Sequence, residues 1–165
     1  MTIPKETLGL AGEFAVASEL CKRGIYAQLT LGNRKRTDLL VDNGESVLRV
    51  EVKSKQGKEW PGVKGIYLDE SVIVFVDFYN KDELERPDFF VLTVKDWKSF
   101  ARKKLRESTP GFGTLNEQFI LSWNDGKYVG VGIKPPQIEK HREAWHKLKP
   151  RDLTTNSVLS DIVAP

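Results

Sequence analysis

Three charged residues, Asp38, Glu51 and Lys53, have the types and the spacing that could do chemistry. Residues 47–53 alternate between apolar and charged side chains over most of their length, which predicts a β-strand. Alternate residues of a strand share a face, so Glu51 and Lys53 point to the same side. Because charges are costly in a protein core, we expect that side to border a wet cleft.

The turn between two strand-like runs places Asp38 relative to Glu51. The Asn43-Gly44 pair between the runs favours a hairpin with a two-residue loop. In that register Asp38 lies opposite Arg49 and is the diagonal neighbour of Glu51, roughly 7–8 Å away between Cα atoms. A slip of one residue would move Asp38 to the other face of the sheet. The expected register therefore brings two carboxylates close enough to share one cation.

The oxygen-rich character of this site predicts a hard divalent cation. Carboxylate and backbone-carbonyl oxygens suit Mg²⁺ or Mn²⁺ rather than Zn²⁺. The single cysteine, Cys21, excludes both a disulfide framework and a cysteine-based zinc site. His141 and His146 are five residues apart, about 140° around a helix, which suits no shared metal.

The elements that must position these residues follow from periodicity. The spacing of Leu10, Phe14, Ala17 and Cys21 predicts a helix over 5–23 with these side chains inward and Cys21 buried as a small hydrophobe. Strands are predicted over 26–31, 37–41, 47–53, 72–78 and 89–94. The last two are almost wholly apolar and suit the centre of a sheet.

The remaining segments complete a mixed α/β pattern. The Lys- and Gly-rich stretch 54–69 predicts a mobile loop, in which Trp60 would either stack on a base or pack locally. An amphipathic helix is expected over 95–107, a hairpin over 119–133 and a last helix over 138–148. We therefore expect a central mixed sheet flanked by helices.

Composition bounds the class of protein. The chain has 165 residues, 39% hydrophobic and 30% charged, which fits one folded domain rather than a disordered chain. No apolar run approaches the roughly 20 residues that span a bilayer. The N-terminus lacks a signal-peptide pattern, so we expect a soluble, cytoplasmic protein with no membrane partner.

The charge distribution is uneven although the net charge is only +3. Residues 37–94 carry 12 acidic and 7 basic side chains, whereas both flanking segments are basic. This distribution fits a carboxylate-lined metal site within a surface that attracts phosphates. It also fits a solvated surface on which charges cluster at random.

The pattern of Asp38 followed by Glu51-Val52-Lys53, preceded by a helix that carries Glu13, resembles the PD-(D/E)XK nuclease superfamily. The likeness is closer to its small archaeal Holliday-junction-resolvase-like and uncharacterised branches, through the three segments Gly9-Leu10-Ala11-Gly12-Glu13, Gly24-Ile25-Tyr26 and Glu51-Val52-Lys53-Ser54. It covers about residues 5–94, and Thr37 stands where the family name has proline. It implies one domain over 1–165, with a restriction-endonuclease-like core at about 5–110 and a C-terminal extension of hairpin and helix at about 111–165.

The resemblance also implies roles for individual residues. Asp38 and Glu51 would ligate Mg²⁺ or Mn²⁺, together with the carbonyl of Val52. Lys53 would orient or deprotonate the attacking water, or stabilise charge on the phosphate, and two nearby carboxylates favour the electrostatic role. Glu13 would be either an outer ligand acting through water or an ordinary exposed helix carboxylate.

Several basic and polar residues are candidates for contact with nucleic acid. Arg34, Lys35 and Arg36 directly precede the strand of Asp38, and Lys55 and Gln56 follow the strand of Glu51. The alternative for each is a solvated loop residue. The basic face of the helix over 95–107 is more typical of a solubilising surface than of a DNA-binding one.

The expected function is a metal-dependent nuclease that hydrolyses phosphodiester bonds of nucleic acid, with DNA as the expected partner. A catalytically idle nuclease-fold domain that binds nucleic acid or another protein is the alternative. The chain has no Gly-rich phosphate loop, nucleophile elbow or dinucleotide fingerprint, which argues against a small-molecule α/β enzyme. The resemblance leaves a homodimer open.

Overall fold

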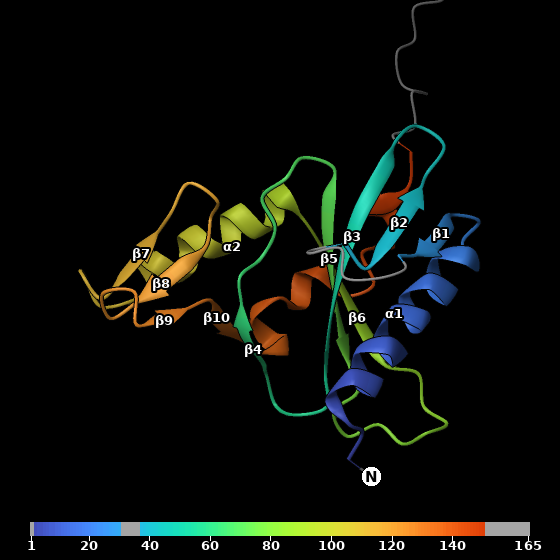
Figure 1. Ribbon diagram of the computed structural model, residues 1–165, viewed down its shortest axis with the longest axis horizontal. Coiled ribbons are helices and arrows are strands. Elements are labelled where there is room, and N and C mark those ends of the chain that lie inside the picture. The colour runs from blue at the N-terminus through green and yellow to red at the C-terminus, as the bar shows by residue number, and fades with distance from the viewer. Residues whose placement is uncertain (1, 31–36, 151–165) are drawn as a thin grey trace, which may run out of the picture.

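A five-stranded mixed sheet forms the centre of the computed structural model, which describes residues 2–30 and 37–150 (Figure 1). In the order β1-β2-β3-β5-β6, its strands are β1 (Tyr26–Leu29), β2 (Leu39–Asp42), β3 (Val47–Lys55), β5 (Ser71–Asp77) and β6 (Asp88–Thr93). Strands β3 and β5 are parallel, and the other neighbours are antiparallel. The expected mixed α/β class is confirmed.

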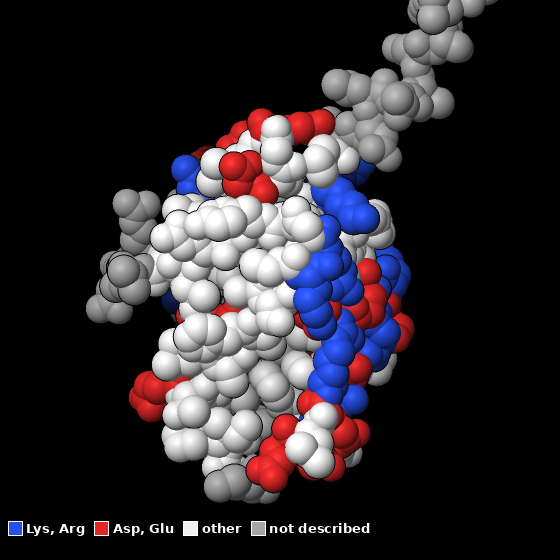
Figure 2. Space-filling model, turned by 90° about the vertical axis from the view of Figure 1, so that its right-hand side faces the viewer, with Lys and Arg blue, Asp and Glu red and all other residues white. Residues whose placement is uncertain are grey.

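Helix α1 (Lys5–Cys21) covers one face of the sheet and buries a different stripe from the expected one. Leu8, Gly12, Val16 and Leu20 face the sheet, whereas Leu10 and Phe14 are 51% and 60% exposed. Cys21 is also exposed, so its expected burial is wrong. Apolar and small residues occur all around this helix, and periodicity alone therefore did not identify the buried side. Figure 2 shows the result, a broad surface with few charges.

Helix α2 (Val94–Arg106) covers the other face and confirms the amphipathic pattern. It begins in a capping box, in which Thr93 and Asp96 bond reciprocally to each other's backbone. Trp97, Phe100 and Ala101 pack into a second core beneath it. Neither described helix combines the length and hydrophobicity needed to cross a bilayer.

Residues 54–69 are more ordered than the expected loop. β3 extends to Lys55, and β4 (Trp60–Val63) pairs with β10 (Val131–Ile133). Trp60 is 2% exposed, packs edge-on against Phe75 and donates a hydrogen bond to the Val76 carbonyl at 3.3 Å. It is therefore a core residue and cannot stack on a base.

The C-terminal segment packs against both cores rather than standing apart. A small sheet holds β7 (Gly113–Leu115), β8 (Leu121–Trp123) and β9 (Tyr128–Val129), and β10, which follows β9 in the chain, pairs with β4 in a separate two-stranded sheet. The expected helix over 138–148 is wrong: two 3₁₀ turns, η2 (Glu139–His141) and η3 (Trp145–Leu148), take its place, and η1 (Pro135–Gln137) precedes them. Glu143, with a φ of 50°, interrupts any continuous helix there.

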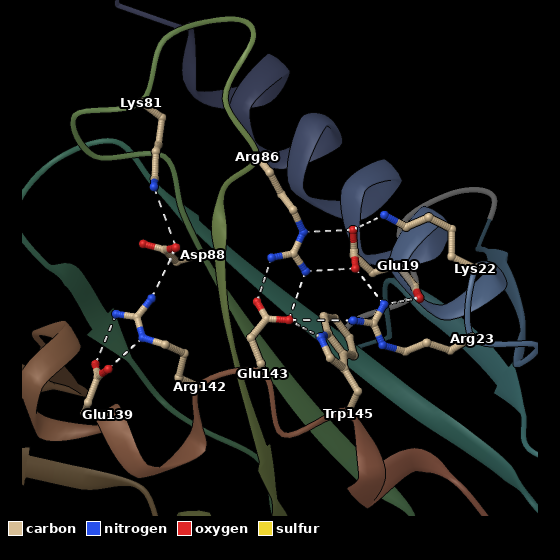
Figure 3. Close-up of polar contacts among 10 residues, drawn as sticks. All are labelled: Glu19, Lys22, Arg23, Lys81, Arg86, Asp88, Glu139, Arg142, Glu143 and Trp145. Atoms are coloured by element: carbon tan, nitrogen blue, oxygen red, sulfur yellow. Dashed lines mark hydrogen bonds and ion pairs between the residues drawn. The ribbon is translucent and has the colours of Figure 1, made fainter.

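An ion-pair network ties this segment to α1 (Figure 3). Glu19 is 5% exposed, and its carboxylate accepts hydrogen bonds from Arg86 at 2.8 and 3.0 Å and from Arg23 at 2.6 Å. Arg86 also binds Glu143, whose carboxylate accepts from the indole N–H of Trp145. The bond from Arg86 and the other cationic donors hold the pKa of Glu19 far below its usual range. The network thus joins three segments that are distant in sequence.

Candidate active site

The hairpin between β2 and β3 carries Asp38 to a position opposite Glu51. The pairing ends at Leu39 with Val50, and the same register continued by one residue brings Asp38, just before β2, level with Glu51. The expected two-residue loop is wrong, because the loop between paired residues 42 and 47 has four residues. The actual register differs from the expected one by two residues, and a shift of two keeps a side chain on the same face.

The carboxylate of Asp38 is fixed by the neighbouring strand. Its Oδ2 accepts a hydrogen bond from the backbone N–H of Val52 at 2.6 Å, while its own N–H donates to the Val50 carbonyl at 2.9 Å. The side chain therefore takes the place of a backbone acceptor at the point where the regular pairing ends. This bond holds the carboxylate against β3, directly beside the Glu51-Val52-Lys53 segment.

Glu51 combines an ion pair with an unsatisfied oxygen. Its Oε1 lies 2.7 Å from the ammonium of Lys53, and the residue is only 8% exposed. Its Oε2 is buried and has no hydrogen-bond partner in the described part of the protein. A buried carboxylate oxygen without a partner costs free energy, so this atom suits a bound cation or water. The Lys53 side chain is 38% exposed and can reach a ligand from the surface.

The donor set fits a hard cation that keeps part of its water shell. Within residues 2–30 and 37–150, no three acidic, His or Cys side chains gather tightly enough to hold one ion. Two carboxylates and a backbone carbonyl would leave several coordination positions to water. Mg²⁺ is commonly bound in this manner, through one or two carboxylates.

Glu13 is coupled to the site from helix α1. Partial burial raises its pKa above the ordinary value, the negative charge of Asp38 raises it further, and Lys53 lowers it. This coupling requires the helix to approach closely, and Gly12 permits it. A Cβ on Gly12 would lie 1.8 Å from Ser54 Oγ on β3. The absence of a side chain at Gly12 therefore lets α1 bring its carboxylate to the strand.

Two of the expected contact residues are used within the protein. The ammonium of Lys55 is buried, where it pairs with Asp77 and donates to the Gly57 carbonyl at 3.0 Å. The amide of Gln56 binds the backbone of Ile3 twice, at 2.9 and 2.6 Å. Both side chains are therefore committed to internal contacts. Arg34, Lys35 and Arg36 lie outside the described residues.

A small recess beside Glu51 was not expected from the sequence. It is lined by Ile66, Tyr67, Leu68 and Ser71 and has a volume of about 10 Å³, close to the space of one water molecule. The segment 66–68 lacks periodicity, so its position against β3 follows only from the tertiary fold. The recess gives the buried carboxylate a neighbouring space for a small ligand.

Comparisons with known proteins gave structural neighbours only. No family profile and no curated protein sequence matches the chain. A bacterial homing endonuclease, I-Ssp6803I, is similar at 18% identity over 89% of this chain and 92% of that chain, with a TM-score of 0.46. Hjc, a Holliday junction resolvase from the archaeal hyperthermophile Archaeoglobus fulgidus, is similar at 14% identity over 87% and 98%, with a TM-score of 0.46. The case for a site rests on the residues of this chain.

Proposed function

We propose that the protein is a metal-dependent nuclease that hydrolyses phosphodiester bonds of nucleic acid, with DNA as the expected substrate. The observation that carries the proposal is the buried, unsatisfied Oε2 of Glu51, next to Lys53 and across the strand pair from the fixed carboxylate of Asp38. A divalent cation would give that oxygen a partner.

Each residue of the site has a chemical task in this proposal. Asp38, Glu51 and the Val52 carbonyl would hold Mg²⁺ or Mn²⁺, which supplies Lewis-acid stabilisation of phosphate oxygens when bound. The positive charge of Lys53 would stabilise the negative charge that builds on the phosphate during attack by water. The raised pKa of Glu13 makes it a better proton acceptor than an ordinary glutamate, which suits a residue that holds water at the edge of the site.

The ion pair between Glu51 and Lys53 supports a second candidate. At 2.7 Å it gives both side chains a partner without any metal. A catalytically idle domain that binds nucleic acid or another protein would have a use for this pairing. The two candidates differ in whether the charge of Lys53 raises the rate of phosphodiester cleavage.

Single-turnover cleavage of plasmid and branched DNA with Mg²⁺, against EDTA, tests the proposal. Lys53→Ala should slow cleavage by roughly 100- to 1000-fold, the effect of one positioned charge on a transition state, and leave DNA affinity nearly unchanged. Glu51→Gln should weaken Mn²⁺ binding in calorimetry, whereas Glu59→Gln, the same change at an exposed position, should not. If the parent protein cuts no substrate and binds no cation, the second candidate replaces the first.

A further inference from the structure

A cleft of about 840 Å³ opens at one end of the central sheet. Residues of the β2–β3 turn, the start of β5 and the start of α2 line it, and these elements lie at the upper end of the sheet in Figure 1. Ser71 lines both this cleft and the small recess beside Glu51. The cleft therefore adjoins the candidate active site, although Asp38 and Lys53 do not line it.

One wall of the cleft is a row of cations on α2. Lys95, Lys98 and Arg102 line it at positions i, i+3 and i+7, which share one side of a helix. Lys98 and Arg102 are held in place by the ring of Phe119, with its centroid 5.0 Å from the Lys98 ammonium and 4.8 Å from the Arg102 guanidinium carbon. Because these cations are already positioned, less side-chain entropy is lost when they bind an anion.

The spacing of this row matches a phosphate backbone. Seven residues of α-helix span about 10 Å, and successive phosphates of one DNA strand advance about 3.4 Å along the duplex axis and lie farther apart in an extended strand. The row can therefore contact two or three consecutive phosphates. Lys149 adds positive charge at the same cleft, whereas the charge of Lys147, which also lines it, is paired with Asp96 at 2.8 Å.

Other residues that line the cleft carry hydrogen-bond acceptors and negative charge. Asn43 from the hairpin turn and Asp69 and Glu70 before β5 line it. A duplex has phosphates on both sides and would meet repulsion from these carboxylates. A single strand has phosphates on one edge and bases on the other, and carboxylates accept hydrogen bonds from base amino groups such as the N4 of cytosine.

We propose that this cleft binds an unpaired strand of the nucleic-acid substrate, with phosphates along α2 and base edges toward Asp69 and Glu70. The inference rests on the proposed nuclease function and deepens it, because it names unpaired nucleotides next to the cutting site as the recognised feature. Because Ser71 lines both the cleft and the small recess, the bound strand would lie next to the recess that borders Glu51.

Fluorescence anisotropy with a labelled oligodeoxycytidylate of about 12 nucleotides tests the cleft, in EDTA so that no cleavage occurs. The triple variant Lys95→Gln, Lys98→Gln, Arg102→Gln removes the row. The matched control Lys103→Gln, Lys104→Gln, Arg106→Gln removes the same charge from the same helix outside the cleft. At about 0.1 M salt the cleft variant should bind roughly 100-fold more weakly, and its salt slope should flatten by about 2, or about 0.7 for each lost phosphate contact. The control should stay near the parent.

Three outcomes would overturn the inference. Equal losses in both triple variants would mean that binding depends on net charge alone. A blunt duplex of the same sequence that binds more tightly than the single strand would assign the cleft to duplex DNA. A poly-glutamate peptide of equal charge that binds as tightly as the oligonucleotide, and that loses affinity in the cleft variant but not in the control, would assign the cleft to an acidic protein partner. Since all binding is measured in EDTA, a protein that fails to cleave DNA leaves this result standing, and the two proposals can fail separately.

Discussion

The buried ring of His141 should make the stability of this protein fall as the pH drops below neutrality. His141 is 4% exposed, and its Nδ1 lies 2.8 Å from the ammonium of Lys147. An ammonium has only donors, so Nδ1 accepts this bond in the neutral ring. Burial, the positive charge of Lys147 and, to a smaller extent, Lys140 lower the pKa of His141 from 6.5 to about 4, while Asp96 opposes the shift.

The sign and size of the effect follow from these two pKa values. Between pH 6.5 and about 4 the unfolded chain binds a proton at this position and the folded protein does not, so acidification favours unfolding. One pKa unit corresponds to about 1.4 kcal/mol, which makes the full effect about 3 kcal/mol. Roughly 2 kcal/mol of it should be lost between pH 7 and pH 5, above the range in which most carboxylates titrate.

Urea unfolding at several pH values between 7 and 5 measures this dependence. His141→Gln should be less stable than the parent at pH 7, and its free energy of unfolding should fall much less between pH 7 and pH 5. His146→Gln removes the only other histidine and should keep the decline. A parent whose decline survives in His141→Gln would show that other groups cause it, and the argument from the buried ring would be refuted.

Further predictions concern packing and charge. Gly12→Ala should lower the free energy of unfolding by about 1–3 kcal/mol, because the added Cβ clashes with Ser54 Oγ. Adding Ser54→Ala should restore much of that free energy in a double-mutant cycle measured by urea unfolding. Additive losses from the two changes would contradict the contact. Glu19→Gln should cost about 1.5–3 kcal/mol, because it removes the charge that Arg86 and Arg23 share, whereas Glu139→Gln, an exposed pair, should cost less than about 1 kcal/mol in the same assay. Equal costs for Glu19→Gln and Glu139→Gln would mean that the buried network stabilises the fold no more than an exposed ion pair does.

Much of the sheet could be predicted because its strands follow simple rules. The apolar runs at β5 and β6 and the alternation along β3 are strong local signals, and the structure confirms these strands. The face predicted for Asp38 relied on an incorrect register, but the true pairing differs by two residues, a shift that leaves the predicted face unchanged. The loop length depends on Asn43, whose Oδ1 accepts from the N–H groups of residues 45 and 46, a local contact that an Asn-Gly pair does not specify.

Other features depended on tertiary contacts and could not be predicted. Trp60 is buried because β4 meets β10, a pairing between segments about 70 residues apart. Lys55 was predicted as a polar loop residue that contacts nucleic acid, yet Asp77 on the adjacent parallel strand gives it a buried partner. The coupling of Glu13 to Asp38 and Lys53 likewise needs the close packing of α1, for which Gly12 was only a compositional hint.

The hairpin between β2 and β3 lets the lining of the large cleft change without moving Asp38 relative to Glu51. Buried Leu39, Val41 and Val50 fix the pairing of the strands, so residues inserted after Asp42 would lengthen the turn and leave Asp38 across from Glu51. The same turn supplies Asn43 to the wall of the large cleft. If both proposals hold, mutation or laboratory grafting at this turn would alter which ligands enter the cleft while Asp38 and Glu51 keep their arrangement, so that selectivity would evolve separately from the cutting reaction.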